Sequence, residues 1–201
     1  LAQQTALSLK RDVERLTAQF VAVCERHRRY RDYPRAALRE AVREVLASFP
    51  VYRTYVRPGA VTPTAERVVG TAVADARARR PDIDGDLLGF LADILLLHHG
   101  GPVETELAQR FQQVCAAVTA KGVEDTAFYR FNRLVALNEV GGDPGTFGVS
   151  VDAFHEHNQR VSREWPETML SLSTHDTKRS ADVRARIAFL SEIPAEWEAA
   201  V

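Results

Sequence analysis

The segment SLSTHDTKRS, residues 171–180, gathers side chains suited to chemistry, because His175, Asp176, Lys178 and Arg179 lie within five positions of one another. The uncharged run before them is typical of a short strand, and the apolar spacing after them predicts a helix. In a barrel of alternating strands and helices, reactive side chains lie at the C-terminal ends of the strands. An aspartate at such an end can accept hydrogen bonds from sugar hydroxyls, and a neighbouring histidine can donate one.

The same corner also has a purely structural interpretation. Asp176 or Ser180 could cap the following helix by accepting hydrogen bonds from its free backbone N–H groups. Spacing alone does not separate the sugar-holding interpretation from the capping one.

A second cluster of acids, cations and aromatic residues lies in KGVEDTAFYR, residues 121–130. Aromatic faces can stack on sugar rings while charged groups bind the hydroxyls. A salt-bridged surface loop is the alternative, and the spacing alone favours it. The candidate binding residues of this cluster are Lys121, Glu124, Asp125, Tyr129 and Arg130.

Two further features have weaker functional interpretations. The loop NEVGGDPG, residues 138–145, lacks the spacing of a phosphate-binding loop and is typical of a flexible loop, although such loops often border active sites. The pair His98-His99 and the run HEH at 155–157 lack the HExxH spacing of a zinc site, so helix-end or surface histidines are favoured. We therefore predict neither a metal nor a cofactor.

The elements that must position these clusters are mostly helical. Apolar residues recur at helical spacing through most of the chain, whereas VYRTYV is rich in β-branched and aromatic residues. The helix over 84–101 is apolar on nearly all sides, so it should be buried and end at its glycines. Helices are predicted over 2–29, 38–49, 62–80, 84–101, 102–120, 150–165 and from 181 onward, with short strands at 51–56 and 169–173.

Composition narrows the class of protein. The chain has 201 residues, 45% of them hydrophobic, with a net charge of −1, which suits a globular protein and does not favour nucleic-acid binding. No apolar run approaches the roughly 20 residues needed to span a bilayer. Cys24 and Cys115 lie in apolar helical patterns, which favours reduced thiols in the cytoplasm. Both ends fall within helical patterns, as expected of a piece of a longer polypeptide.

Three segments together resemble the maltooligosyl trehalose synthase family, which belongs to the α-amylase family of retaining α-glucan enzymes. The resemblance is specific there and covers about a third of the chain, while the helical first 120 residues are compatible with it. The segments are VYRTYV, AKGVEDTAFYRFNRLVALNEVGGDPGTFGVS and WPETMLSLSTHDTKRSADVRAR.

The resemblance implies an activity. The family converts the reducing-end α-1,4 bond of a maltooligosaccharide into an α,α-1,1 bond by intramolecular transglucosylation. Retaining chemistry of this kind uses a carboxylate nucleophile and a second carboxyl group as acid and base. A third carboxylate holds the hydroxyls of the sugar under attack. The pathway partner of such an enzyme is maltooligosyl trehalose trehalohydrolase.

The resemblance also implies roles for particular residues. Asp176 matches the third carboxylate, and His175 matches its hydroxyl-binding neighbour. Lys121 and Lys178 match basic positions that bind the reducing-end glucose, which must stay bound while it turns over. Arg179 lies beside them and is included among the substrate-binding candidates.

The family's nucleophile motif and general-acid strand do not occur in this sequence. Both lie upstream in the family, and the adjacent Glu124 and Asp125 do not suit the roughly 5 Å carboxyl separation of a retaining pair. We therefore expect a mainly α fragment that needs the upstream part of the same polypeptide and is inactive alone. Residues 1–120 would form a helical region, and 121–201 would carry strand and helix elements of a partial (β/α)8 barrel.

The sequence also permits two other interpretations. One is a helical scaffold or interaction module in which the corner is only a cap. The other is a metal-dependent phosphohydrolase built on His175 and Asp176, which would need further ligands from the remaining histidines. Substrate length, oligomeric state and the ratio of mutase to hydrolase outcomes do not follow from the sequence.

Overall fold

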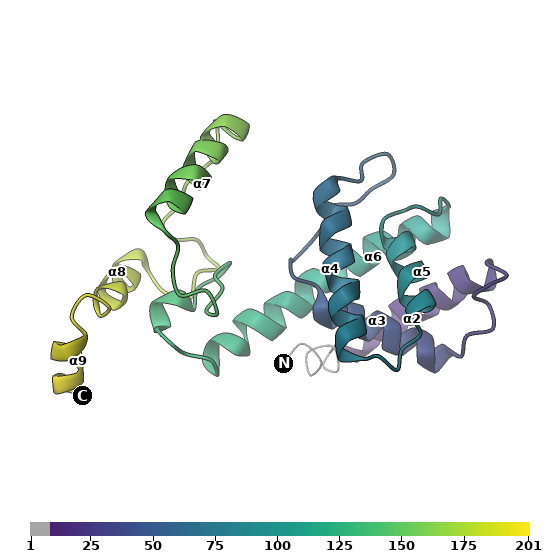
Figure 1. Ribbon diagram of the computed structural model, residues 1–201, viewed down its shortest axis with the longest axis horizontal. Helices are drawn as coiled ribbons and strands as arrows, with labels where there is room; N and C mark the ends of the chain where they lie inside the picture. The colour runs from purple at the N-terminus through teal and green to yellow at the C-terminus, as the bar shows by residue number, and fades with distance from the viewer. Residues whose placement is uncertain (1–8) are drawn as a thin grey trace. The chain divides into compact units, whose positions relative to one another are not determined.

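The computed structural model describes residues 9–201, and this part of the chain is mostly helical. It divides into two compact units, the first ending at Thr126 and the second comprising Ala127–Val201. Figure 1 shows both units. The prediction of a mainly α protein is confirmed.

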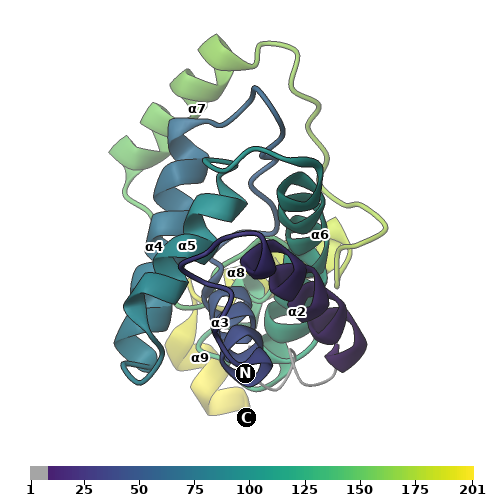
Figure 2. The same cartoon turned by 90° about the vertical axis from the view of Figure 1, so that its right-hand side faces the viewer.

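The described part of the first unit is a bundle of five α-helices around one apolar core (Figure 1). Helix α2 packs against α3 and α6, and α4 packs against α3 and α5, with α4 and α5 side by side in Figure 2. Phe20, Phe90 and Phe111 are fully buried at its centre. The helices are α2 (Lys10–Glu25), α3 (Arg35–Ser48), α4 (Pro63–Arg79), α5 (Gly85–Leu95) and α6 (Pro102–Thr119).

These helices lie where the apolar spacing predicted them, apart from their ends. Thr62 caps α4 by accepting a hydrogen bond from the Ala65 N–H, and Pro63 occupies the first turn. Asp84 caps α5 in the same way through the Asp86 N–H. The first predicted helix ends at Glu25 rather than at residue 29, and its predicted residues 2–8 lie outside the described part.

The predicted glycine end of α5 is wrong. The helix ends at Leu95, and Leu97 takes the left-handed conformation with φ of 55°. The His98 N–H reaches back to the Asp93 carbonyl at 2.9 Å and the Leu97 N–H to the Ile94 carbonyl at 3.0 Å, which is the Schellman pattern. Leucine replaces glycine there because its side chain packs against the core, which offsets the backbone cost.

The second unit has little core of its own. It contains α7 (Val151–Glu164), α8 (Ala181–Phe189), α9 (Pro194–Ala200) and the 3-10 turns η2 (Ala127–Tyr129) and η3 (Val135–Leu137). None of its three α-helices buries a residue. Large apolar side chains remain exposed along it, among them Phe154, Trp165, Met169, Leu170 and Leu172.

Both predicted strands are wrong. Residues 51–56 and 169–173 are irregular, and no strand occurs in the part of the chain that the structure describes. A strand needs a neighbouring strand to pair its backbone N–H and C=O groups, and neither segment has one within residues 9–201. Only an isolated bridge between Arg57 and Ala60 follows the first segment.

No helix within residues 9–201 is long and apolar enough to cross a membrane.

The contrast between the units predicts a difference in local stability. Limited trypsin digestion of the 201-residue chain should cut residues 127–201 first and leave a resistant fragment ending near Thr126. Few buried apolar side chains in the second unit oppose local opening, whereas the first unit shields its sites with a continuous core. Mass spectrometry of the time course identifies the cuts. Equally fast cleavage within α2–α6, which contain many arginines, would contradict the expectation.

Candidate functional site

A buried carboxylate holds the polar corner at residues 174–179 in place. Glu139 is 8% exposed, and its Oε1 accepts hydrogen bonds from the backbone N–H groups of Lys178 at 2.7 Å and Val140 at 2.9 Å. Its Oε2 accepts the N–H of Arg179 at 3.2 Å. One side chain therefore binds two consecutive amides of a segment about forty positions further along the chain.

The hydrogen bonds outweigh the burial in setting the charge of this side chain. Burial alone raises the pKa of Glu139. The hydrogen bonds from the N–H groups of Lys178, Val140 and Arg179, together with the charge of Arg184, lower the pKa by more than burial raises it, so the net pKa is depressed. The carboxylate is thus the form that folding favours. Its stabilising effect is present above the ordinary glutamate pKa of 4.5 and is lost as the pH falls through the lowered value.

Asn138 secures the chain on the other side of Glu139. It is 1% exposed, and its Nδ2 donates to the carbonyls of Phe128 and Phe131, both at 2.8 Å. The backbone carbonyl of Asn138 accepts a hydrogen bond from Arg179 Nη1 at 3.0 Å. Asn138 and Glu139, here called the clamp, therefore join the segment after Phe128 to the polar corner.

Within the corner, two threonines form a tight turn. Thr177 Oγ1 donates to the Thr174 carbonyl at 2.8 Å, and the Asp176 N–H reaches Thr174 Oγ1 at 3.3 Å. His175 Nε2 lies 3.4 Å from Asp176 Oδ1, and their side chains are 92% and 66% exposed. The two side chains predicted to hold a sugar are thus adjacent and point to open solvent in this chain.

The structure decides which residue caps the helix after the corner. Ser180 occupies the N-cap of α8 and accepts a hydrogen bond from the Val183 N–H. Asp176 lies four residues earlier and is not the cap. The capping interpretation is therefore confirmed for Ser180 and does not account for Asp176.

The second predicted cluster begins where α6 widens into one turn of π-helix, η1 (Ala120–Glu124). Lys121 Nζ lies 2.6 Å from Asp125 Oδ2, and this contact raises the pKa of Lys121, chiefly through the hydrogen bond. Tyr52 Oη donates to Glu124. VYRTYV therefore meets the KGVEDT segment through the Tyr52–Glu124 contact.

The candidate residues fall into both units. Lys121, Glu124 and Asp125 belong to the first, whereas Tyr129 and Arg130 are exposed in the second, which also carries the corner. The structure brings Lys121 to Asp125, and His175 to Asp176.

Sequence reasoning missed Asn138 and Glu139, which it placed in a flexible loop. Two polar residues just before the Gly141-Gly142 turn carry no pattern that distinguishes a buried clamp from a solvated loop. Only the return of residues 178–179 to this point makes their burial favourable.

The three histidines of the first unit contact other side chains of that unit. His99 and His27 pack edge-on against each other and against Phe90, and His98 lies 3.1 Å from Asp93. Within residues 9–201, no three His, Cys, Asp or Glu side chains converge as metal ligands would.

The solved structures to which the chain is similar are of glycosyltrehalose-forming enzymes. The chain is similar to maltooligosyltrehalose synthase from Arthrobacter ramosus, with a TM-score of 0.76 and 34% identity over 97% of this chain and 23% of that one. It is also similar to a structure described as DSM5389 glycosyltrehalose synthase, with a TM-score of 0.62 and 30% identity over 98% of this chain and 21% of that one.

Curated relatives agree with the solved structures. Proteins from two strains of Mycobacterium tuberculosis, provisionally named maltooligosyl trehalose synthase, are 47% identical over 130 residues, or 65% of this chain. The chain spans only 16% of the length of these relatives. No protein-family model matches it. The resemblance to maltooligosyl trehalose synthase predicted from the sequence is confirmed, and the coverage is that of a fragment.

The clamp yields a direct prediction. Glu139→Gln should speed amide hydrogen exchange at Lys178 and Arg179 by about tenfold or more, because an uncharged amide binds more weakly and turns its own N–H donors toward at least one of the three backbone N–H groups. Exchange followed residue by residue by NMR measures this effect.

Glu156→Gln, the same change at an exposed position of α7, is the matched control and should leave both amides unchanged. Exchange at Lys178 and Arg179 that is equal in the wild-type protein and in Glu139→Gln would show that the carboxylate does not hold the corner.

Proposed function

We propose that this chain is part of an intramolecular transglucosylase, a glucan 1-α-glucosylmutase of trehalose biosynthesis. The enzyme would convert the reducing-end α-1,4 bond of a maltooligosaccharide to an α,α-1,1 bond. The observation that carries the proposal is the position of Asp176 in the clamped corner. Its carboxylate lies beside His175 and does not cap the following helix. The named relatives support the same reaction class.

Asp176 would act on the substrate as a sugar-holding carboxylate. Its Oδ atoms would accept hydrogen bonds from hydroxyls of the ring under attack, and these bonds strengthen as that ring approaches the oxocarbenium-like transition state. His175 would donate to a neighbouring hydroxyl. Fixed groups of this kind lower the barrier because they are oriented before the reaction begins.

The basic residues would retain the product of the first step. Lys178 and Lys121 would bind the freed reducing-end glucose while it turns over to present its anomeric hydroxyl. Arg179, Glu124, Asp125, Tyr129 and Arg130 would line the same region. Holding the freed glucose with water excluded favours transfer over hydrolysis.

The remaining catalytic groups would come from the upstream part of the same polypeptide. The nucleophile and general acid are absent from the recognised segments, so the 201-residue chain is expected to be inactive alone. In the parent protein, residues 121–201 would complete a (β/α)8 barrel. The exposed apolar side chains of the second unit support this arrangement, because large exposed apolar surface is typical of an uncovered interface.

The setting of the parent enzyme follows from the same proposal. Maltooligosyl trehalose trehalohydrolase would consume its product, and the cytoplasm would be its compartment. Two free, buried cysteines suit a reducing compartment, and burial raises the pKa of the Cys24 thiol to about 12.

Asp176→Asn in the parent enzyme tests the proposal. With maltohexaose as substrate, the parent should remove reducing ends, because the 1,1 linkage consumes them. The variant should do so about a hundredfold more slowly or worse, since a neutral amide cannot stabilise the developing positive charge. A colorimetric assay of reducing ends measures the rate.

Asp182→Asn makes the same chemical change at an exposed position six residues further on and should keep the parental rate. If Asp176→Asn and Asp182→Asn behave alike, the corner has no catalytic role, and the helical scaffold interpretation gains support.

A further inference from the structure

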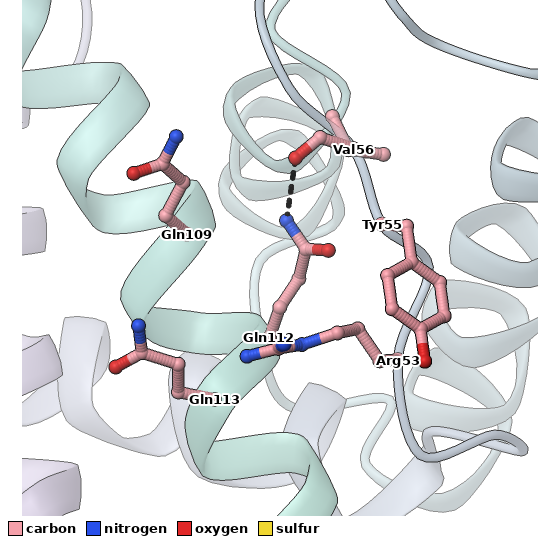
Figure 3. A pocket seen from close by; sticks show the side chains of 6 residues that line it. All are labelled: Arg53, Tyr55, Val56, Gln109, Gln112 and Gln113. Atoms are coloured by element: carbon pink, nitrogen blue, oxygen red, sulfur yellow. Dashed lines mark hydrogen bonds between the residues drawn. The ribbon is translucent and has the colours of Figure 1, made fainter.

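A polar pocket lies on the first unit, apart from every residue assigned a role above. Figure 3 shows it between α6 and residues 53–56. Its volume is about 240 Å³. Its lining has no acidic side chain and no aliphatic one except that of Val56. The lining residues are Arg53, Tyr55, Val56, Gln109, Gln112 and Gln113.

Gln112 forms a fixed polar wall of this amide pocket. Its side chain is 5% exposed, and its Nε2 donates to the carbonyls of Val56 at 2.9 Å and Ala108 at 3.3 Å. Figure 3 shows its amide oxygen turned toward the side on which Tyr55 lies. Gln112 thus ties the irregular segment to α6 and presents an oriented acceptor.

Two exposed glutamines extend the polar surface. Gln109 and Gln113 are one helical turn apart, so they lie on the same face of α6 and beside each other. Each amide offers two N–H donors and an acceptor oxygen. A sugar hydroxyl is both donor and acceptor, and neutral amides match it without the cost of desolvating a charge.

Arg53 and Tyr55 form the opposite wall. Arg53 Cζ lies 5.8 Å from the centroid of the Tyr55 ring. Tyr55 has φ of 59° and is 74% exposed. A bulky residue in the left-handed region is strained, and such strain is concentrated at ligand-binding sites.

We propose that the amide pocket binds an α-1,4-glucan segment and is a binding site separate from the corner at Asp176. The exposed Tyr55 ring supplies a stacking face, the glutamine amides bind the hydroxyls, and Arg53 donates to ring or hydroxyl oxygens. A volume below the roughly 300 Å³ at which pockets for drug-sized ligands begin suits a short sugar segment. The choice of an α-1,4-glucan among polyols rests on the proposed function.

The test titrates maltotetraose into the ¹⁵N-labelled 201-residue chain. We expect saturable NMR shifts in the side-chain amides of Gln109 and Gln113 and in the backbone amide of Val56. Tyr55→Asn should weaken binding at least tenfold, because asparagine tolerates the left-handed conformation but has no ring.

A second variant, with Gln109 and Gln113 both changed to alanine, alters only exposed positions and should also weaken binding at least tenfold. Gln159→Ala, an exposed glutamine of α7, is the matched control and should keep the wild-type affinity. Unchanged affinity in Tyr55→Asn and in the double variant would overturn the proposal.

Inorganic phosphate, titrated in parallel, separates a sugar site from an anion site at Arg53. Shifts with phosphate but not with maltotetraose would overturn the proposal, as would no saturable shift at the pocket. These outcomes are independent of the reducing-end assay, which reports on Asp176 in the parent enzyme, so either proposal can fail alone.

Discussion

The burial of the Glu139 carboxylate is the interaction on which the candidate site depends. A buried carboxylate is unfavourable unless hydrogen bonds compensate it, and here the N–H groups of Val140, Lys178 and Arg179 do so. This requirement fixes where the polar corner lies relative to the loop after Phe128. Asp176 can therefore remain exposed without losing its position, because the backbone on its C-terminal side is held by a group other than its own side chain.

The two units meet the general requirement for burial in different ways. The first unit encloses Phe20, Phe90, Phe111 and many aliphatic side chains, so its helices stabilise one another. The second unit is organised by a few polar contacts and leaves Trp165 and Met169 exposed. The corner at Asp176 is open to solvent in this chain, whereas the catalytic role proposed for Asp176 needs a site closed to water. The proposed upstream part of the parent would supply that closure.

Apolar periodicity predicted the helices of the first unit because each helix buries one face in a local, repeating pattern. The prediction of strands at 51–56 and 169–173 was wrong because strand formation depends on a pairing partner that composition does not reveal. The predicted end of α5 was wrong because the packing of Leu97 overrode the usual preference for glycine after a helix. The role proposed for Asp176 comes from its motif, whereas Glu139 was missed because its role arises only from a contact across about forty residues.

A double-mutant cycle in the parent enzyme tests most directly whether the clamp acts through the corner. Maltohexaose turnover would be compared for the parent, Glu139→Gln, Asp176→Asn and the double variant. The account predicts that Glu139→Gln slows the parent but adds little once Asp176 is already changed, because both substitutions disable the same group. Fully additive losses, or parental turnover in Glu139→Gln, would contradict it.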